Sequence, residues 1–146
     1  MPDHSELHAT AAERLRAEDQ RYTSSRRALV DALAAATRPP TIPELLSAQP
    51  DLAQSSAYRN LAALEQVGVV RRIVTSDEHA RFELAEDLTG HHHHLVCGTC
   101  GRIEDFTVSH KLERSLEAAL AKVADGTGFQ VDHHRLDLVG TCSGCS

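Results

Sequence analysis

Hydrophobic residues recur every three to four positions along the first half of the chain, which is the period of an amphipathic helix. This pattern predicts four helices, over residues 4–20, 22–36, 41–49 and 55–67. In the last of them Ala57, Leu61 and Leu64 form one apolar stripe. Ser55 or Ser56 is the expected N-terminal cap of this helix.

After the fourth helix the pattern changes to the shorter period of β-strands. Residues 69–75 and 80–84 favour strands around the polar turn "SDEH", so a hairpin is expected there. Helices followed by a two-stranded wing are the order of a winged-helix DNA-binding domain, whose last helix enters the major groove. The rest of the chain predicts a small α/β unit, with strands at 93–97, 102–106 and 129–140 and a helix at 109–124.

These elements predict an α+β protein with two domains and a short connection. The expected boundaries are residues 1–85 for the winged-helix DNA-binding domain, 86–90 for the hinge linker and 91–146 for the second unit. Only 3% of the 146 residues are aromatic, so metal binding or dimerisation is expected to add stability. No apolar run is long enough to span a membrane and no signal peptide precedes the first helix, so we expect a cytoplasmic protein.

The net charge of −6 argues superficially against nucleic-acid binding, but charge is unevenly distributed. Residues 21–81 contain eight arginines and six acidic residues. At the start of the fourth helix, small polar and basic side chains cluster where a recognition helix meets bases and phosphates. The predicted DNA contacts are Ser55, Ser56, Tyr58 and Arg59 of this helix, with Arg26 and Arg71 as phosphate contacts.

Two Cys-x-x-Cys pairs, Cys97 with Cys100 and Cys142 with Cys145, are separated by 41 residues. In a reducing cytoplasm four thiolates in this arrangement predict a closed tetrahedral zinc site of the structural kind. The alternatives are two disulfides or inert thiols. Because metal binding at such a site is largely folding energy, removal of zinc is expected to unfold residues 89–146.

Four consecutive histidines, residues 91–94, precede the first cysteine. In an extended strand alternate side chains face opposite sides, so His91 and His93 form one pair and His92 and His94 another. Each pair can contribute to a separate metal site; a remnant of an expression tag and a solvated surface run are the alternatives. The available partners are Glu113 and His134 in the second unit, and His79 and Glu83 in the hairpin.

Such mixed nitrogen and oxygen ligands accept Zn²⁺, Fe²⁺, Ni²⁺ or Mn²⁺, so the ligand types alone do not identify the metal.

The chain resembles the ferric uptake regulator (Fur) family of bacterial metal-responsive repressors over nearly its whole length. The resemblance rests on "YTSSRRALVDAL", "SSAYRNLAALEQVGVV", "RFELAEDLTGHHHHLVCGTCGRIEDF" and "DHHRLDLVGTCSGC". It implies a homodimer, with residues 91–146 as the metal-binding dimerisation domain, that binds double-stranded palindromic operator DNA when its sensing metal is bound.

The resemblance also implies a role for each group of ligands. Structural zinc is assigned to the four cysteines, and a dimerisation-domain site to His91, His93, Glu113 and His134. His92, His94 and Glu83 match the hinge site, which couples metal to the angle between the domains. Two departures leave the hinge site short of a usual ligand, because Pro40 stands where iron sensors place a histidine and Ala85 where zinc sensors place a cysteine. His79 is the predicted replacement, and Glu117 is an alternative to Glu113.

The predicted function is zinc-responsive, metal-dependent repression of metal-homeostasis genes, with structural Zn²⁺ and a second regulatory Zn²⁺. Iron, nickel or peroxide sensing is the alternative within the same class, with Fe²⁺, Ni²⁺ or Mn²⁺ as the regulatory ion. A zinc hydrolase and a metal-storage protein are alternatives of another class. We expect a protein without enzymatic activity, because no His-Glu-x-x-His motif is present and the ligands suffice to close each site.

Overall fold

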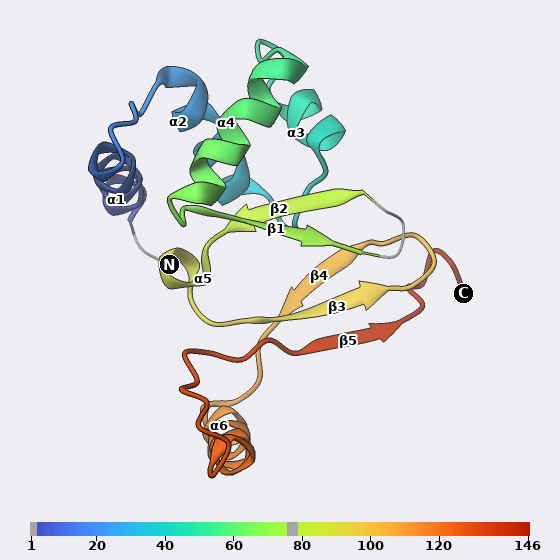
Figure 1. The fold of residues 1–146 in the computed structure, drawn as a ribbon. Helices are drawn as coiled ribbons and strands as arrows, with labels where there is room; N and C mark the ends of the chain where they lie inside the picture. Colours follow the sequence, from blue (N-terminus) through green and yellow to red (C-terminus); the bar gives the residue numbers. More distant parts are fainter. Residues whose placement is uncertain (1–2, 76–78) are drawn as a thin grey trace.

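The computed structural model describes residues 3–75 and 79–146, and its helices and strands follow the order expected from the sequence. The elements are α1 (His4–Ala17), α2 (Ser24–Ala35), α3 (Ile42–Ala48), α4 (Gln54–Gln66), β1 (Val70–Val74), β2 (Ala80–Leu84), α5 (Glu86–Thr89), β3 (His93–Cys97), β4 (Ile103–Phe106), α6 (His110–Ala124) and β5 (Asp137–Gly140). Figure 1 shows the β1–β2 sheet between the N-terminal helices and a second sheet, with α6 beyond it.

Local sequence explains where the N-terminal helices begin and end. The Thr23 and Thr41 hydroxyls accept backbone hydrogen bonds at the starts of α2 and α3. Gly68, with a positive φ of 77°, follows the end of α4. The expected serine cap of α4 is wrong, because the helix begins one residue earlier than expected and its cap is Ala53. Ser55 and Ser56 therefore lie within the first turn.

β1 and β2 form the predicted antiparallel hairpin, in which Val70 pairs with Leu84 and Val74 with Ala80. Most of the predicted turn "SDEH" lies outside the described residues. A further contact extends the hairpin toward the helices, because the Phe82 amide donates to the Pro40 carbonyl at 2.9 Å. The chain between α2 and α3 is thereby fixed beside β2.

One hydrophobic core joins the N-terminal helices to the wing. Its buried members include Leu15, Leu29 and Leu64 from the helices and Phe82 from β2, and Leu88 of α5 also belongs to it. The expected linker is therefore a helical turn anchored on the first domain. Arg14 of α1 strengthens this anchor by donating to the Gly68 carbonyl and to Asp87.

The C-terminal unit is a three-stranded sheet in the order β4-β3-β5, in which β3 pairs antiparallel with β4 and parallel with β5. The last strand is shorter than predicted, since residues 129–136 are irregular and only Asp137–Gly140 pairs with β3. Among the described residues after Gly90 the buried side chains are His93, His94, Cys97 and Ile103. The buried side chains of this unit are therefore mostly ones that can bind metal, whereas those of the first domain are mostly apolar.

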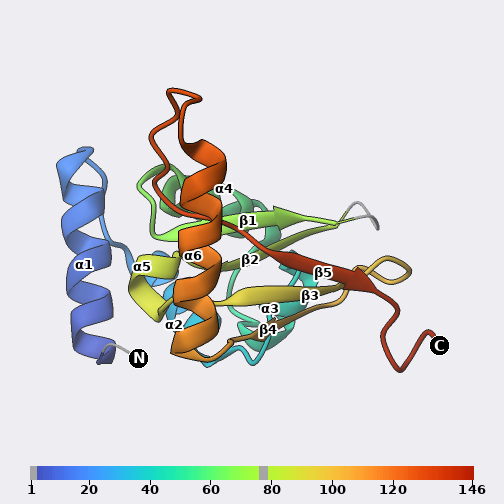
Figure 2. The same cartoon turned by 90° about the horizontal axis from the view of Figure 1, so that it is seen from below.

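The outer surface of the C-terminal unit is rich in exposed apolar side chains. No residue of α6 is buried, although its Ser109 cap is formed, and all of β5 is exposed at the edge of the sheet. Exposed residues here are Leu112, Val123, Phe129, Leu138 and Val139. Figure 2 shows α6 and β5 on the side of the molecule that faces away from the N-terminal helices. No helix among the described residues is both long and apolar enough to cross a membrane.

Candidate metal centres

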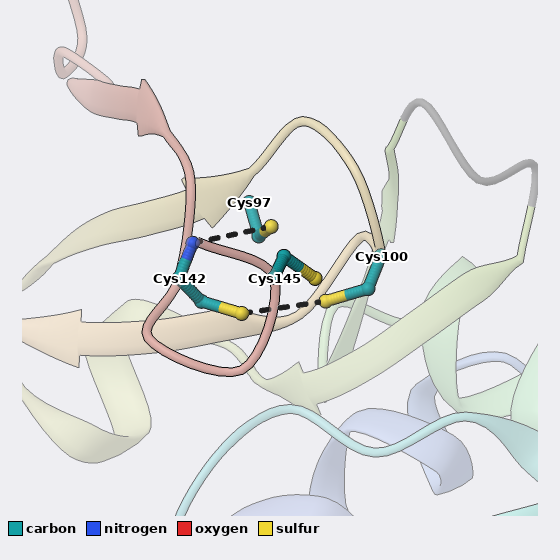
Figure 3. A group of neighbouring side chains, drawn as sticks. All are labelled: Cys97, Cys100, Cys142 and Cys145. Atoms are coloured by element: carbon teal, nitrogen blue, oxygen red, sulfur yellow. Dashed lines mark hydrogen bonds between the residues drawn. The ribbon is translucent and has the colours of Figure 1, made fainter.

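The four cysteines converge at one end of the β3–β5 pair (Figure 3). Cys97 ends β3 and lies opposite Gly140 in the parallel register, so Cys142 follows directly beside it. The sulfur atoms of Cys100 and Cys142 are 3.8 Å apart. Two thiolates at about 2.3 Å from one tetrahedral zinc ion are about 3.8 Å apart, whereas disulfide sulfurs are about 2.05 Å apart. All four cysteines are free, and the cluster fits a structural zinc site.

The electrostatics of this cluster also favour a cation. Backbone hydrogen bonds from Cys100 and Cys142 lower the pKa of the Cys97 thiol to about 5. Hydrogen bonds to Cys142 and Cys100 raise the pKa of the Cys145 thiol to about 12. One thiolate therefore forms readily, but all four cannot ionise together at neutral pH unless a positive ion compensates their charge.

A second cluster holds His91, His93, Glu113 and His134. Glu113 lies in the first turn of α6, which the Ser109 cap fixes, and its carboxylate faces three imidazoles. Its Oε1 lies 2.7 Å from His91 Nε2 and 2.8 Å from His134 Nε2, and its Oε2 lies 2.8 Å from His93 Nε2. The hydrogen bond with His93 is the main reason that the pKa of Glu113 falls to about 2. The carboxylate is thus ready to bind a cation.

The structure distinguishes between the two glutamates considered for this cluster. Glu113 is half-buried beside the imidazoles, whereas Glu117, one turn further along α6, is exposed and lies outside the group. The separation of His91 and His93 from His92 and His94 follows the alternation expected of an extended chain.

A third cluster holds Glu83, His92, His94 and Asp105, and it spans the two domains. Glu83 belongs to β2 of the wing, whereas the other three residues lie on or beside the β3–β4 pair. Glu83 Oε2 lies 3.1 Å from Nε2 of both His92 and His94, and His94 Nε2 lies 3.4 Å from Asp105 Oδ1. A cavity of about 260 Å³, lined in part by Pro40, Glu83, His92 and Asp105, opens onto this cluster.

His79 does not take part in this hinge cluster. It is exposed, and it precedes Glu83 by four residues, a separation of about 13 Å along an extended strand. Asp105 is the fourth member of this group instead, because it pairs directly with His94 across β3 and β4. The sequence "RIEDF" contains Asp105, but identifying it as a neighbour of His94 required the register between β3 and β4.

Opposing effects set the charge of the hinge cluster. Burial alone would raise the pKa of Glu83, but hydrogen bonds from His92 and His94 and the charge of Arg71 hold it well below its usual range. The hydrogen bond with Glu83 raises the pKa of His92 to about 9. Burial raises the pKa of Asp105. Without metal, His92 at neutral pH is therefore a cation that neutralises Glu83.

The predicted DNA contacts divide into two groups. On α4, Ser55, Tyr58 and Arg59 are exposed and Ser56 is half-buried, and neither serine is used as the helix cap. These side chains form one end of an accessible helix face.

Arg26 and Arg71 are partly buried and make hydrogen bonds within the protein. Arg26 donates to Asn60 Oδ1 and to the Arg21 carbonyl, and Arg71 donates to Glu83. Both guanidinium groups therefore have partners within the domain, and their role as phosphate contacts stays a prediction.

Comparison with known proteins agrees with these features. The model of the ferric uptake regulator family matches residues 17–139. The peroxide operon regulator of Bacillus subtilis is 31% identical over 93% of this chain and 91% of its own length. The ferric uptake regulator of Pseudomonas aeruginosa, solved with manganese, has a TM-score of 0.70 and 25% identity and covers 98% of this chain and 99% of its own.

A further solved structure, that of the Helicobacter pylori ferric uptake regulator, has the same fold, with a TM-score of 0.76 at 20% identity. It covers 99% of this chain and 94% of its own. The fold class predicted from the sequence is confirmed. The match of the family model over most of the chain, together with the convergence of the cysteines and of the two histidine pairs, shows that the chain belongs to the ferric uptake regulator family.

Proposed function

We propose that this protein is a metal-dependent transcriptional repressor whose regulatory ion binds the hinge cluster. The observation that carries the proposal is that Glu83 of the wing converges with His92, His94 and Asp105 of the second domain. The distances between their carboxylate oxygens and imidazole nitrogens are 3.1–3.9 Å. A bound divalent cation would supply a positive charge shared by ligands from both domains. The chain's own residues thereby link metal availability to the position of the wing.

The coupling follows from the origin of the ligands. Glu83 is rigidly held by β2, and His94 and Asp105 by the β3–β4 pair, so an arrangement that brings them together fixes the angle between the domains. Metal stabilises that arrangement only through its higher affinity for it. In this arrangement two α4 helices of a dimer would match successive major grooves of an operator.

DNA recognition is assigned to the exposed start of α4. Arg59 can donate two hydrogen bonds to a guanine, and Ser55, Ser56 and Tyr58 can contact phosphates or base edges. Members of the family are dimeric and bind operator DNA. We assign the dimer interface of this chain to the exposed apolar side chains of α6 and to the free edge of β5. The palindromic operator expected from the sequence follows from the two-fold symmetry of such a dimer.

The identity of the regulatory ion depends on the ligand types. The zinc-responsive function expected from the sequence is compatible with two imidazoles and two carboxylates, but this set contains no thiolate that would favour zinc over iron or manganese. Zinc at the cysteine cluster and a regulatory divalent ion at the hinge are therefore separate proposals. The family consists of transcription regulators, so the hydrolase and storage alternatives receive no support.

Peroxide sensing is the second candidate function, and specific observations favour it. Relatives include the peroxide operon regulator of Bacillus subtilis and the peroxide-responsive repressor of Staphylococcus saprophyticus, which is 31% identical over 90% of this chain and 86% of its own length. The hinge cluster combines two imidazoles with two carboxylates and opens onto a cavity that admits a small molecule. Fe²⁺ held by such ligands would let peroxide oxidise His92 or His94.

Operator binding by the full-length protein with different metals tests both functions. A fluorescence-anisotropy titration would use Zn²⁺, Fe²⁺ or Mn²⁺, each before and after hydrogen peroxide. A zinc-responsive repressor binds DNA with Zn²⁺ and keeps its affinity after peroxide. A peroxide sensor binds with Fe²⁺, loses affinity after peroxide and gains one oxygen atom on the peptide that contains residues 91–94. Failure to bind operator DNA with any of the metals would contradict the proposed repressor function.

A hinge variant separates the regulatory ion from the fold. His92→Ala is expected to abolish the metal dependence of DNA binding while leaving the circular dichroism unchanged, because its side chain lies at the domain junction rather than in the core. His133→Ala is the matched control, since His133 is exposed and belongs to none of the clusters. An unaltered metal response in His92→Ala would count against the hinge assignment.

A further inference from the structure

A fourth group of metal-binding side chains lies outside the three centres described above. His4 and His8 of α1 meet Asp31 of α2, and one potential ligand atom of each residue lies within 4.8 Å of the other two. His8 Nε2 is 2.7 Å from Asp31 Oδ1, and His4 Nδ1 is 3.9 Å from the same oxygen. The group is more than 40 residues away in sequence from any ligand of the other clusters.

Helical geometry explains why these residues meet. His4 and His8 are four residues apart, which places both imidazoles on the same face of α1. That face also carries the buried residues Leu7, Ala11 and Leu15, which pack α1 into the core. Asp31 lies near the middle of α2 and is half-exposed. Packing of the two helices thus fixes the carboxylate opposite the histidine pair.

Tyr22 orients the central histidine. Its hydroxyl is hydrogen-bonded to His8 Nδ1, while Nε2 of the same ring faces Asp31. Burial raises the pKa of Tyr22 to about 12, so its oxygen stays protonated and uncharged. When His8 carries its proton on Nδ1 and donates it to the Tyr22 oxygen, Nε2 has a free lone pair directed at the cluster. Hydrogen bonds of this kind commonly orient metal-binding histidines.

The donor set fits a divalent transition metal. Two imidazoles four residues apart on a helix, with one carboxylate from a neighbouring element, are a common set of three protein ligands that leaves further positions for water. Ligand atoms about 2.1 Å from one ion lie about 3.4 Å apart in a tetrahedral site. His8 and Asp31 are already closer than this, and His4, whose side chain is 69% exposed, can rotate toward them.

We propose that His4, His8 and Asp31 form an additional binding site for Zn²⁺ or a chemically similar divalent transition metal, which joins α1 to α2. The site differs from the hinge cluster in that all its ligands belong to the winged-helix domain. Its occupancy would fasten the N-terminal half of α1, whose other half is held by Arg14 through Gly68 and Asp87. The proposal is independent of the regulatory ion and of the operator.

Metal stoichiometry of the full-length protein tests the site. Wild type, His4→Ala and Asp31→Asn would be dialysed against buffered Zn²⁺, and bound zinc per chain measured by atomic emission. His4 is exposed and Asn retains the shape of Asp, so both variants are expected to fold like wild type by circular dichroism. The wild type should bind one more zinc ion per chain than either variant. Equal stoichiometry in all three proteins would overturn the proposal.

A control and a more selective variant sharpen the result. Glu6→Ala removes an exposed carboxylate from the same helix without touching the group, and it should bind as much zinc as wild type. Tyr22→Phe keeps all three ligands but removes the hydrogen bond to His8, so it should weaken zinc binding at this site about 10–100-fold. A loss in Glu6→Ala equal to that in His4→Ala would show nonspecific binding along α1 and would contradict the site.

Discussion

Arg71 forms an ion pair with Glu83, and the proposed regulatory ion would neutralise the same carboxylate, so Arg71→Met gives a specific prediction. The guanidinium donates to Glu83 Oε1, while Oε2 faces His92 and His94. A metal ion at the hinge would add positive charge to a group that Arg71 has already partly neutralised. Removal of Arg71 should therefore destabilise the metal-free protein and strengthen metal binding at the same time.

The size of the effect can be derived from the burial of the pair. Removing one partner of a fully buried ion pair costs about 3–5 kcal/mol. Here the Arg71 side chain is 23% exposed and Glu83 keeps its two histidine partners, so we expect a loss of about 1–2 kcal/mol in the metal-free protein. For a protein of this size the unfolding temperature should fall by about 2–8 °C.

Thermodynamic linkage converts this loss into metal affinity. If the bound ion replaces Arg71 as the neutralising charge, Arg71→Met does not destabilise the metal-loaded protein. The loss of about 1–2 kcal/mol in the metal-free variant then makes its metal affinity about 5–30-fold higher than that of wild type. Competition with a fluorescent chelator measures the affinity, and thermal unfolding with and without metal measures the stability.

Arg72→Met is the matched control, because it removes the same charge from the neighbouring position of β1. Arg72 is more than half exposed, and its only ion-pair contact in the described residues is with Glu65 at 3.7 Å. We expect its metal affinity to equal that of wild type. Unchanged or weaker metal binding in Arg71→Met would refute the reasoning. At saturating metal, Arg71→Met should also retain the salt dependence of operator binding, whereas a lost phosphate contact would reduce the slope by about 1.

Three further predictions concern pH, the zinc cluster and the dimer. Because the pKa of His92 is raised from 6.5 to about 9, metal must displace the proton of His92 at neutral pH. The affinity of the hinge cluster for metal, measured by chelator competition, should therefore rise about tenfold from pH 7 to pH 8 and level off above about pH 9. The same shift stabilises the metal-free fold fully below pH 6.5, and this contribution is lost as the pH rises through 9. Cys142→Ser, or chelation of zinc, should unfold the C-terminal unit in circular dichroism, whereas Ser143→Ala should not; native spectra in the chelated protein would exclude a structural role. Val139→Lys, which places a charge on the exposed face of β5, should shift sedimentation from dimer to monomer, and an intact dimer would place the interface elsewhere.

The sequence predicted those features that depend on local spacing. The Cys-x-x-Cys pairs needed only the turn that brings two sulfurs together, and the alternation of residues 91–94 needed only an extended chain. Strand register was not available from spacing, which is why His79 was chosen and Asp105 was missed. The last strand was predicted too long because residues 129–136 have strand-like alternation but no neighbouring strand to pair with.

Long-range partners account for the other differences. Arg26 and Arg71 looked like free cations, because nothing local shows that Asn60 and Glu83 lie beside them. The exposed start of α4 was predicted correctly as a helix with small polar residues, but its cap was misplaced by two or three residues. The group formed by His4, His8 and Asp31 could not be anticipated, since it depends on how α1 packs against α2.

Because β3 pairs in parallel with β5, we expect the two domains to fold at different times during synthesis. The core of the first domain is complete once β2 and α5 have been synthesised, so this domain can fold while the rest of the chain is still being made. Cys97, in contrast, must wait for Cys142, 45 residues later, before the zinc cluster can close. During that interval the Cys97 thiol and the neighbouring histidines are unpaired ligands, so the cellular supply of zinc during synthesis would determine how much of the protein matures.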